Sequence, residues 1–203
     1  MSYITVGIID YGVGNHASVV HSLRDLGFRV RVSNKKNELD LVDVLLLPGV
    51  GAFPSAMASL HEKGLVQYLK ERCQKGFPLI GICLGMQLLV SNSYEHTFTI
   101  GLDLIPGSIV PFSERKVHIG WNKIKLIQHE PLLSESDGEA FYFNHSFHYK
   151  GVVEFQAATT KHLSTFSSII KNGNVVGLQF HPEKSQLAGK VLLKNLINRL
   201  VNA

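Results

Sequence analysis

Cysteine, charge and long apolar runs are all scarce in this sequence. Its 203 residues include two cysteines, and charged residues make up 18%. So few cysteines argue against a disulfide framework, and we expect reduced thiols in the cytoplasm. The longest strongly apolar stretch, residues 78–90, contains Gln87 and is too short to span a bilayer, so we expect no membrane segment. The first residues also lack the basic start of a signal peptide.

The charge balance excludes a further class of protein. The net charge is +4, and no run of five like charges occurs, so the sequence does not predict a nucleic-acid-binding tract. Hydrophobic residues make up 45% of the chain, which is a globular composition. The length suits one domain, and we expect residues 1–203 to form it.

The order of apolar segments predicts an α/β fold. Short apolar runs at residues 4–10, 28–32, 44–47 and 79–82 indicate strands, and helical spacing fills residues 19–26 and 55–75, with a break at Gly64. Short β-like runs between Gly101 and Gly177 indicate added antiparallel strands, and residues 186–201 form an amphipathic pattern. We therefore expect an open, mixed, mainly parallel sheet with helices on both faces.

Cys83 lies where the fourth apolar strand gives way to a helix, between Gly81 and Gly85. This G-x-C-x-G pattern is the thiol version of a nucleophile elbow. A sharp strand–turn–helix forces neighbouring backbone segments together, so the residues two before and two after the nucleophile must be small. We expect the turn to lift the thiol into solvent and to place it at a helix N-terminus, which favours the thiolate. Cys73 has no such frame and is interpreted as structural.

A thiol nucleophile needs a base, and His181 is the candidate among ten histidines. It ends an apolar strand, and Pro182 keeps it extended. Side chains two apart on an extended chain project to one side, so Glu183 can orient the imidazole. The backbone N–H of Leu84 and the glycine turn around Val50 are candidates for an oxyanion hole. Four other histidines lie in polar contexts and are expected to be exposed: His61, His96, His129 and His162.

Other functions remain open from these residues alone. Residues 12–17 fit G-x-G-x-x-[GA] after a strand, the dinucleotide fingerprint, although Asp10 would oppose a pyrophosphate. A thiol protease would use the same three side chains, and a non-catalytic module would need none of them. His145 and His148 lie close in sequence, but no metal-binding spacing accompanies them, so we predict neither metal nor cofactor.

Several segments together resemble the class I (triad) glutamine amidotransferases. They are Gly-Ile-Cys-Leu-Gly-Met-Gln at 81–87, Phe-His-Pro-Glu-Lys-Ser-Gln at 180–186 and Pro-Gly-Val-Gly at 48–51. Stretches at 10–15, 101–107, 118–122 and 142–147 extend the likeness in order along nearly the whole chain. Within this family the sequence most resembles the glutaminase subunits of imidazole glycerol phosphate synthase. The resemblance implies a flavodoxin-like fold.

The resemblance also implies a reaction. Cys83 would attack the carboxamide of L-glutamine and release ammonia, His181 would act as base and then acid, and Glu183 would orient it. Water would then hydrolyse the glutamyl thioester to glutamate. The family motifs that hold glutamine match Gly51, Gln87, Glu95, Ser146 and Phe147.

The family further implies a heterodimer with a (β/α)₈-barrel cyclase, which receives the ammonia during histidine biosynthesis. Positions near that interface match Asn15, Trp121, Tyr142 and Lys184. The residues alone leave Trp121 equally open as a core aromatic and Lys184 as a solvated loop charge.

The sequence departs from the family pattern after Asn15 and after Gln87, where residues 90–95 contain one acid. The departures leave room for a paralogue that supplies ammonia to a cyclase-like partner in surface-glycan biosynthesis.

Overall fold

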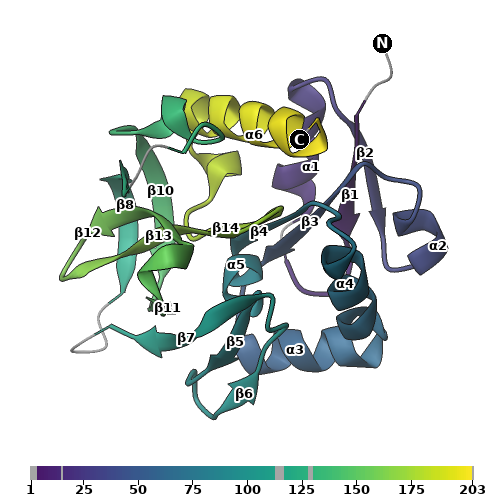
Figure 1. Ribbon diagram of the computed structural model, residues 1–203, viewed down its shortest axis with the longest axis horizontal. Coiled ribbons are helices and arrows are strands. Elements are labelled where there is room, and N and C mark those ends of the chain that lie inside the picture. The colour runs from purple at the N-terminus through teal and green to yellow at the C-terminus, as the bar shows by residue number, and fades with distance from the viewer. Residues whose placement is uncertain (1–3, 15, 113–116, 128–129, 203) are drawn as a thin grey trace.

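The computed structural model describes residues 4–14, 16–112, 117–127 and 130–202, so Asn15 lies outside the described residues. Within them, the main sheet has eight strands in the order β2-β1-β3-β4-β14-β13-β12-β9 (Figure 1). Their bounds are β1 (Thr5–Ile9), β2 (Arg29–Ser33), β3 (Val44–Gly49), β4 (Leu79–Cys83), β9 (Lys125–Leu126), β12 (Gln156–Lys161), β13 (Thr165–Asn172) and β14 (Val175–Leu178).

The sheet is parallel at one end and antiparallel at the other. Strands β2, β1, β3, β4 and β14 pair in parallel, and β13, β12 and β9 continue the sheet antiparallel. The predicted open, mixed sheet is therefore confirmed. The order of the parallel strands is that of a flavodoxin-like fold, in which sites form beyond the carboxyl ends of the strands.

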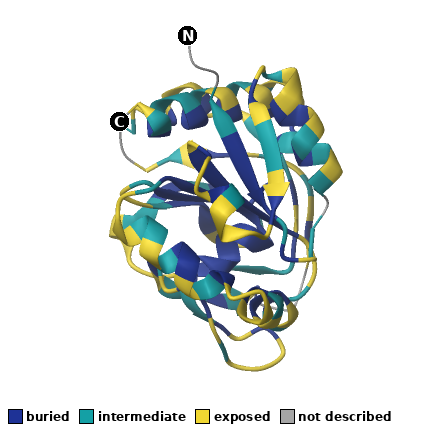
Figure 2. Cartoon of the chain, turned by 90° about the vertical axis from the view of Figure 1, so that its right-hand side faces the viewer, coloured by how far each residue is buried: buried dark blue, intermediate teal, exposed yellow. Residues whose placement is uncertain are grey.

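Helices cover both faces of the sheet, as the sequence predicted. They are α1 (His16–Asp25), α2 (Lys36–Leu39), α3 (Phe53–Glu62), α4 (Leu65–Gln74), α5 (Leu84–Leu88) and α6 (Gln186–Val201). Alternate residues of β3 separate two cores: Leu46 packs in the cluster that contains Leu23 of α1 and Leu196 of α6, and Leu45 in the cluster that contains Leu60 of α3. Figure 2 shows the buried strands inside the exposed outer surfaces of the helices.

Two smaller sheets pack beside the main one. Strand β8 (His118–Lys123) pairs antiparallel with β10 (Ala140–His145). The other sheet has the order β11-β7-β5-β6, formed by β11 (Phe147–Lys150), β7 (Ile105–Pro111), β5 (Val90–Ser93) and β6 (Thr99–Ile100). The expected added strands are present, but β5 pairs with β7 in parallel, and both β5 and β6 lie before residue 101, where no strand was predicted.

Three short 3₁₀ turns complete the described secondary structure, at Ser134–Ser136, Val153–Phe155 and Pro182–Lys184. None of the helices in the described part of the chain combines the length and the apolar character that crossing a bilayer requires.

Packing between strand ends fixes the turn at Cys83. Cys83 is paired with Gly49 across β3 and β4. A Cβ atom on Gly81 would lie 2.6 Å from the carbonyl oxygen of Gly85, and a Cβ atom on Gly85 would overlap the carbonyl oxygen of Leu47. Both clashes are with backbone, which cannot rotate away. The predicted need for small residues two before and two after Cys83 is confirmed.

We predict that Gly85→Ala destabilises the protein by at least ~3 kcal/mol, the upper range for overpacking, because its methyl group meets the Leu47 carbonyl. Gly138→Ala is the matched control: its Cβ meets nothing within 4 Å, and its φ of 77° costs roughly 1–2 kcal/mol. Urea unfolding midpoints measure both. Equal midpoints for the two variants would show that the Gly85 contact does not constrain the fold.

Candidate active site

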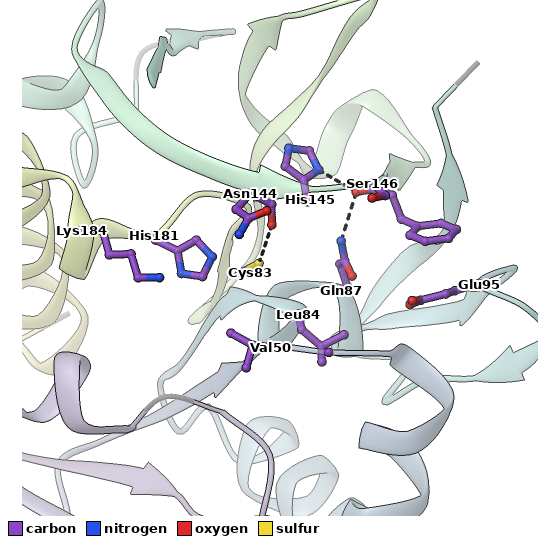
Figure 3. Close-up of a pocket in the computed structure, with 12 residues that line it drawn as sticks. Val50, Cys83, Leu84, Gln87, Glu95, Asn144, His145, Ser146, His181 and Lys184 are labelled. Carbon is purple, nitrogen blue, oxygen red and sulfur yellow. Dashed lines mark hydrogen bonds between the residues drawn. The ribbon is translucent and has the colours of Figure 1, made fainter. Parts of the chain in front are cut away.

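A cavity of about 260 Å³ opens at the carboxyl edge of the parallel strands. Side chains from the ends of β3 and β4, from α5, from the β10–β11 segment and from the turn after β14 meet there (Figure 3). The lining residues are Val50, Gly51, Cys83, Leu84, Gln87, Glu95, Asn144, His145, Ser146, Phe147, His181 and Lys184. The structure thus brings together every described residue predicted for the glutamine pocket and the oxyanion hole.

Cys83 occupies a strained backbone conformation as the N-cap residue of α5. Its φ is 54° and its ψ is −111°, which is rare for a residue with a side chain. The expectation that the turn lifts the thiol into solvent is wrong: Cys83 is only 6% exposed. The β10–β11 segment covers it, and the thiol donates to the carbonyl of Asn144, with 3.9 Å between Sγ and O. The thiol therefore faces the cavity and not open water.

His181 and Glu183 form a buried pair beside Cys83. His181 Nδ1 lies 2.9 Å from Glu183 Oε1, and each side chain is 4% exposed. Burial alone would lower the pKa of His181, but its hydrogen bonds and charge interactions with Cys83 and Glu183 raise that pKa to about 10. The imidazole is thus held in reach of the thiol by a carboxylate.

The reason for this pairing differs from the one the sequence suggested. His181 is extended, as predicted, with φ −101° and ψ 92°. Glu183, however, lies in the 3₁₀ turn Pro182–Lys184 and not on a continuing extended chain. The turn brings its carboxylate back to the ring.

Two backbone segments flank the thiol from the other side. Leu84 directly follows Cys83, and Val50 lies on the turn after β3, beside Gly51 at φ 107°. Tyr11 anchors the start of that turn, because its buried hydroxyl donates to the carbonyl of Pro48 at 2.8 Å.

The rest of the cavity is polar. Glu95 is buried, and its Oε2 accepts from the backbone N–H of Phe53 at 2.9 Å, at the start of α3. Gln87 is also buried, and its Nε2 donates to the carbonyl of Phe147 at 3.1 Å and to Gln179 Oε1 at 3.2 Å. A fixed carboxylate and a fixed amide thus face one small cavity, which suits a ligand with both a cation and hydrogen-bonding groups.

Three residues predicted for a partner interface lie together at one side of the cavity. Trp121 is 49% exposed, so its interpretation as a core aromatic is wrong. Its ring meets that of Tyr142 edge-on, with 6.2 Å between centroids, and Tyr142 lies 6.4 Å from the His181 ring. Lys184 is exposed, as a solvated loop charge would be, and it also lines the cavity next to His181 (Figure 3).

The sequence interpretation missed a histidine cluster that reaches the cavity wall at His145. His118 stacks on His162 with 4.2 Å between ring centroids, and its Nδ1 lies 3.1 Å from His145 Nε2. His162 is therefore partly buried and not exposed as expected; His61 and His96 are exposed, and His129 lies outside the described residues. The available signal was the spacing of Phe141, Phe143 and His145 at every second position, which places the histidine on the same face of a strand as two apolar rings. The partner strand could not be inferred from it.

The remaining candidates have simpler environments. Burial raises the pKa of the Cys73 thiol to about 12, which suits a structural cysteine. Asp10 Oδ1 accepts from the Gly12 N–H at 3.2 Å, so a carboxylate occupies the loop that would have to receive a pyrophosphate. The described residues contain no group of three or more His, Cys, Asp or Glu side chains arranged to hold a metal ion.

Comparison with known proteins gives a consistent result. The family model described as glutamine amidotransferase class-I matches residues 7–199. The chain is 41% identical over 191 residues to "Imidazole glycerol phosphate synthase subunit HisH" of Listeria monocytogenes serotype 4a, covering 92% of each chain. It is 42% identical over 194 residues to the same-named protein of Moorella thermoacetica, covering 94% of this chain and 92% of that one.

Solved structures support the fold independently. "Structure of PurLQS from Thermotoga maritima" matches with a TM-score of 0.80 and 19% identity, covering 98% of this chain and 100% of that one. At this identity the match speaks for the fold alone. Together with the family model and the closely similar HisH relatives, it leads to one conclusion: the chain belongs to the class-I glutamine amidotransferase family and, within it, is similar to the HisH subunits of imidazole glycerol phosphate synthase.

Proposed function

We propose that this amidotransferase hydrolyses L-glutamine to glutamate and ammonia with Cys83, His181 and Glu183. The Cys83 thiolate attacks the side-chain carbonyl carbon, and the carbonyl oxygen becomes an oxyanion beside the backbone of Leu84 and Val50. His181 gives its proton to the departing nitrogen, so ammonia leaves and a glutamyl thioester remains. His181 then takes a proton from water, which attacks the thioester and releases glutamate.

One observation carries this proposal: a buried His181–Glu183 pair, 2.9 Å apart, adjoins a cysteine on a strained elbow inside the cavity. A structural cysteine would need neither the strain nor the paired imidazole. Glu183 fixes the ring with Nδ1 protonated, which leaves Nε2 to exchange protons with the thiol and the substrate.

The cavity favours an amino acid over a peptide. Its volume of about 260 Å³ lies below the ~300–1,000 Å³ of pockets for drug-sized ligands. We assign Glu95 to the substrate ammonium, and Gly51, Gln87 and the backbone of Ser146 and Phe147 to the rest of glutamine. This size argues against the thiol protease alternative, which needs an open cleft.

We further propose that the chain acts as one domain, without a cofactor or metal, in the cytoplasm. Its partner would be a (β/α)₈-barrel cyclase that receives the ammonia and forms imidazole glycerol phosphate and AICAR. The HisH relatives support this partner, and the half-exposed Trp121 beside Tyr142 supports the location of the contact. The names of these relatives do not favour the alternative of a paralogue in surface-glycan biosynthesis.

We predict that Cys83→Ser lowers glutamine-dependent turnover of the complex with the cyclase at least about a thousandfold, because the nucleophile is lost. Turnover with an ammonium salt should stay unchanged, since the cyclase uses ammonia directly. Cys73→Ser is the matched control and should retain glutamine-dependent turnover. Loss of the ammonium-dependent reaction in Cys83→Ser would contradict the proposed division of labour.

We predict that Trp121→Ala weakens binding to the cyclase about 30-fold, corresponding to ~2 kcal/mol, as expected for an aromatic anchor at an interface. The melting temperature should change little, because the side chain is half-exposed. Leu41→Ala is the control, since Leu41 is 71% exposed and follows α2, which packs on β2 at the other end of the sheet. Titration calorimetry measures both affinities, and equal affinities would place the interface elsewhere.

A further inference from the structure

A chain of hydrogen bonds leads from β8 to the wall of the cavity. Asn122 Nδ2 lies 3.4 Å from His118 Nε2, and His118 Nδ1 lies 3.1 Å from His145 Nε2. His145 Nδ1 then lies 2.8 Å from the carbonyl oxygen of Phe147. His118 and His145 stand directly opposite each other in the β8–β10 register, so the strand pairing itself aligns the two rings. Neither ring takes part in the proposed proton transfers.

The direction of every bond in this chain follows from its last acceptor. A carbonyl oxygen only accepts, so His145 must carry its proton on Nδ1, and its Nε2 then accepts from His118 Nδ1–H. His118 Nε2 is left as an acceptor for the Asn122 amide. That amide is itself oriented, because Nδ2 donates to the Lys161 carbonyl at 2.8 Å and Oδ1 accepts from the Lys123 N–H at 2.9 Å.

Burial keeps the two rings neutral, as this chain requires. Burial and the neighbouring His162 lower the pKa of His118 to about 4. Burial also lowers the pKa of His145 to about 3, against the opposing hydrogen bond to Phe147. Both rings therefore keep one donor and one acceptor near neutral pH.

The chain of hydrogen bonds ends on the Phe147 carbonyl oxygen, which also orients the Gln87 side chain. The hydrogen bonds of His145 and Gln87 both go to the Phe147 carbonyl oxygen, and their dashed lines meet beside Ser146 in Figure 3. Because this oxygen accepts, the Gln87 amide must direct Nε2 toward it, and the second Nε2 hydrogen goes to Gln179 Oε1. Oε1 is then the polar atom of Gln87 that these two bonds leave for a ligand in the cavity.

We propose that Asn122, His118 and His145 are positioning residues, which hold the Phe147 carbonyl and through it present Gln87 Oε1 to the substrate. The role assigned to Gln87 rests on the proposed function; the direction of the hydrogen bonds does not. The Phe147 carbonyl turns Gln87 so that its acceptor faces the cavity, and the hydrogen-bond chain holds that carbonyl in place. An acceptor suits the N–H groups of glutamine.

The hydrogen-bond directions are tested on the wild-type protein by ¹⁵N NMR of the histidine side chains at pH 7. Both His118 and His145 should be neutral with the proton on Nδ1, the minor tautomer of free histidine. Assignment follows from loss of one set of signals in His118→Phe and another in His145→Phe. A proton on Nε2 of either ring, or a charged ring, would overturn the proposal whatever the enzyme's activity.

The consequence for the substrate is tested by kinetics of the complex with the cyclase. His118→Phe keeps the stacked ring but removes the donor, so KM for glutamine should rise roughly five- to tenfold, as for one lost hydrogen bond, with kcat changed less than about twofold. His118→Asn restores an N–H near the position of Nδ1 and should recover most of the loss. His162 stacks on His118 but makes none of these hydrogen bonds, so His162→Phe should keep the stacking contact and the wild-type KM.

The outcomes separate the two proposals. A wild-type KM in His118→Phe, or equal impairment in His118→Asn and His118→Phe, would show that the chain does not position Gln87. A wild-type complex that fails to use glutamine would instead contradict the proposed function, and the tautomers would still decide the hydrogen-bond directions. Should His118→Phe not fold, His118→Leu, which also removes the donor to His145, is compared with His118→Asn in its place.

Discussion

The close approach of the β4–α5 turn to the end of β3 is the constraint on which the site depends. Gly85 packs against the Leu47 carbonyl and Gly81 against Gly85, so the backbone between them has no room to relax. Cys83 is therefore held at φ 54°, a conformation that costs roughly 1–3 kcal/mol and persists because the surrounding packing enforces it. Core packing of the parallel strands thus offsets the cost of the strained backbone and holds the Cys83 thiol in one position.

The opposing effects of burial and of neighbouring groups on histidine pKa values set the chemistry around that thiol. His181 is as buried as His118 and His145 are, yet its pKa rises while theirs fall. The difference comes from the neighbours: a carboxylate and a thiol favour the charged ring, whereas neutral rings and a carbonyl do not. One cavity wall therefore holds His181, which is suited to carry a proton, and another holds His145, which with His118 is suited to keep hydrogen bonds in a fixed direction.

Local sequence patterns were sufficient to predict much of the fold and part of the candidate site. The glycine frame of Cys83, the strand–helix alternation and the helix at 186–201 each depend on neighbours within a few residues, so the sequence predicted them. The same holds for pairing His181 with Glu183, although the reason was a 3₁₀ turn and not an extended chain. The burial of Cys83 could not be predicted, because the segment that covers it, at Asn144, lies 61 residues away in sequence.

The sequence by itself determined the fold class and the family and predicted Cys83 as the nucleophile, since these rest on short-range periodicity and on motifs contiguous in the chain. Only the tertiary structure decided which histidines meet. His118 and His145 are 27 residues apart, and their contact depends on the register of β8 against β10. A shift of one residue in either strand would turn that strand's ring to the opposite face, away from the other ring, and the register depends on which face of both strands is buried.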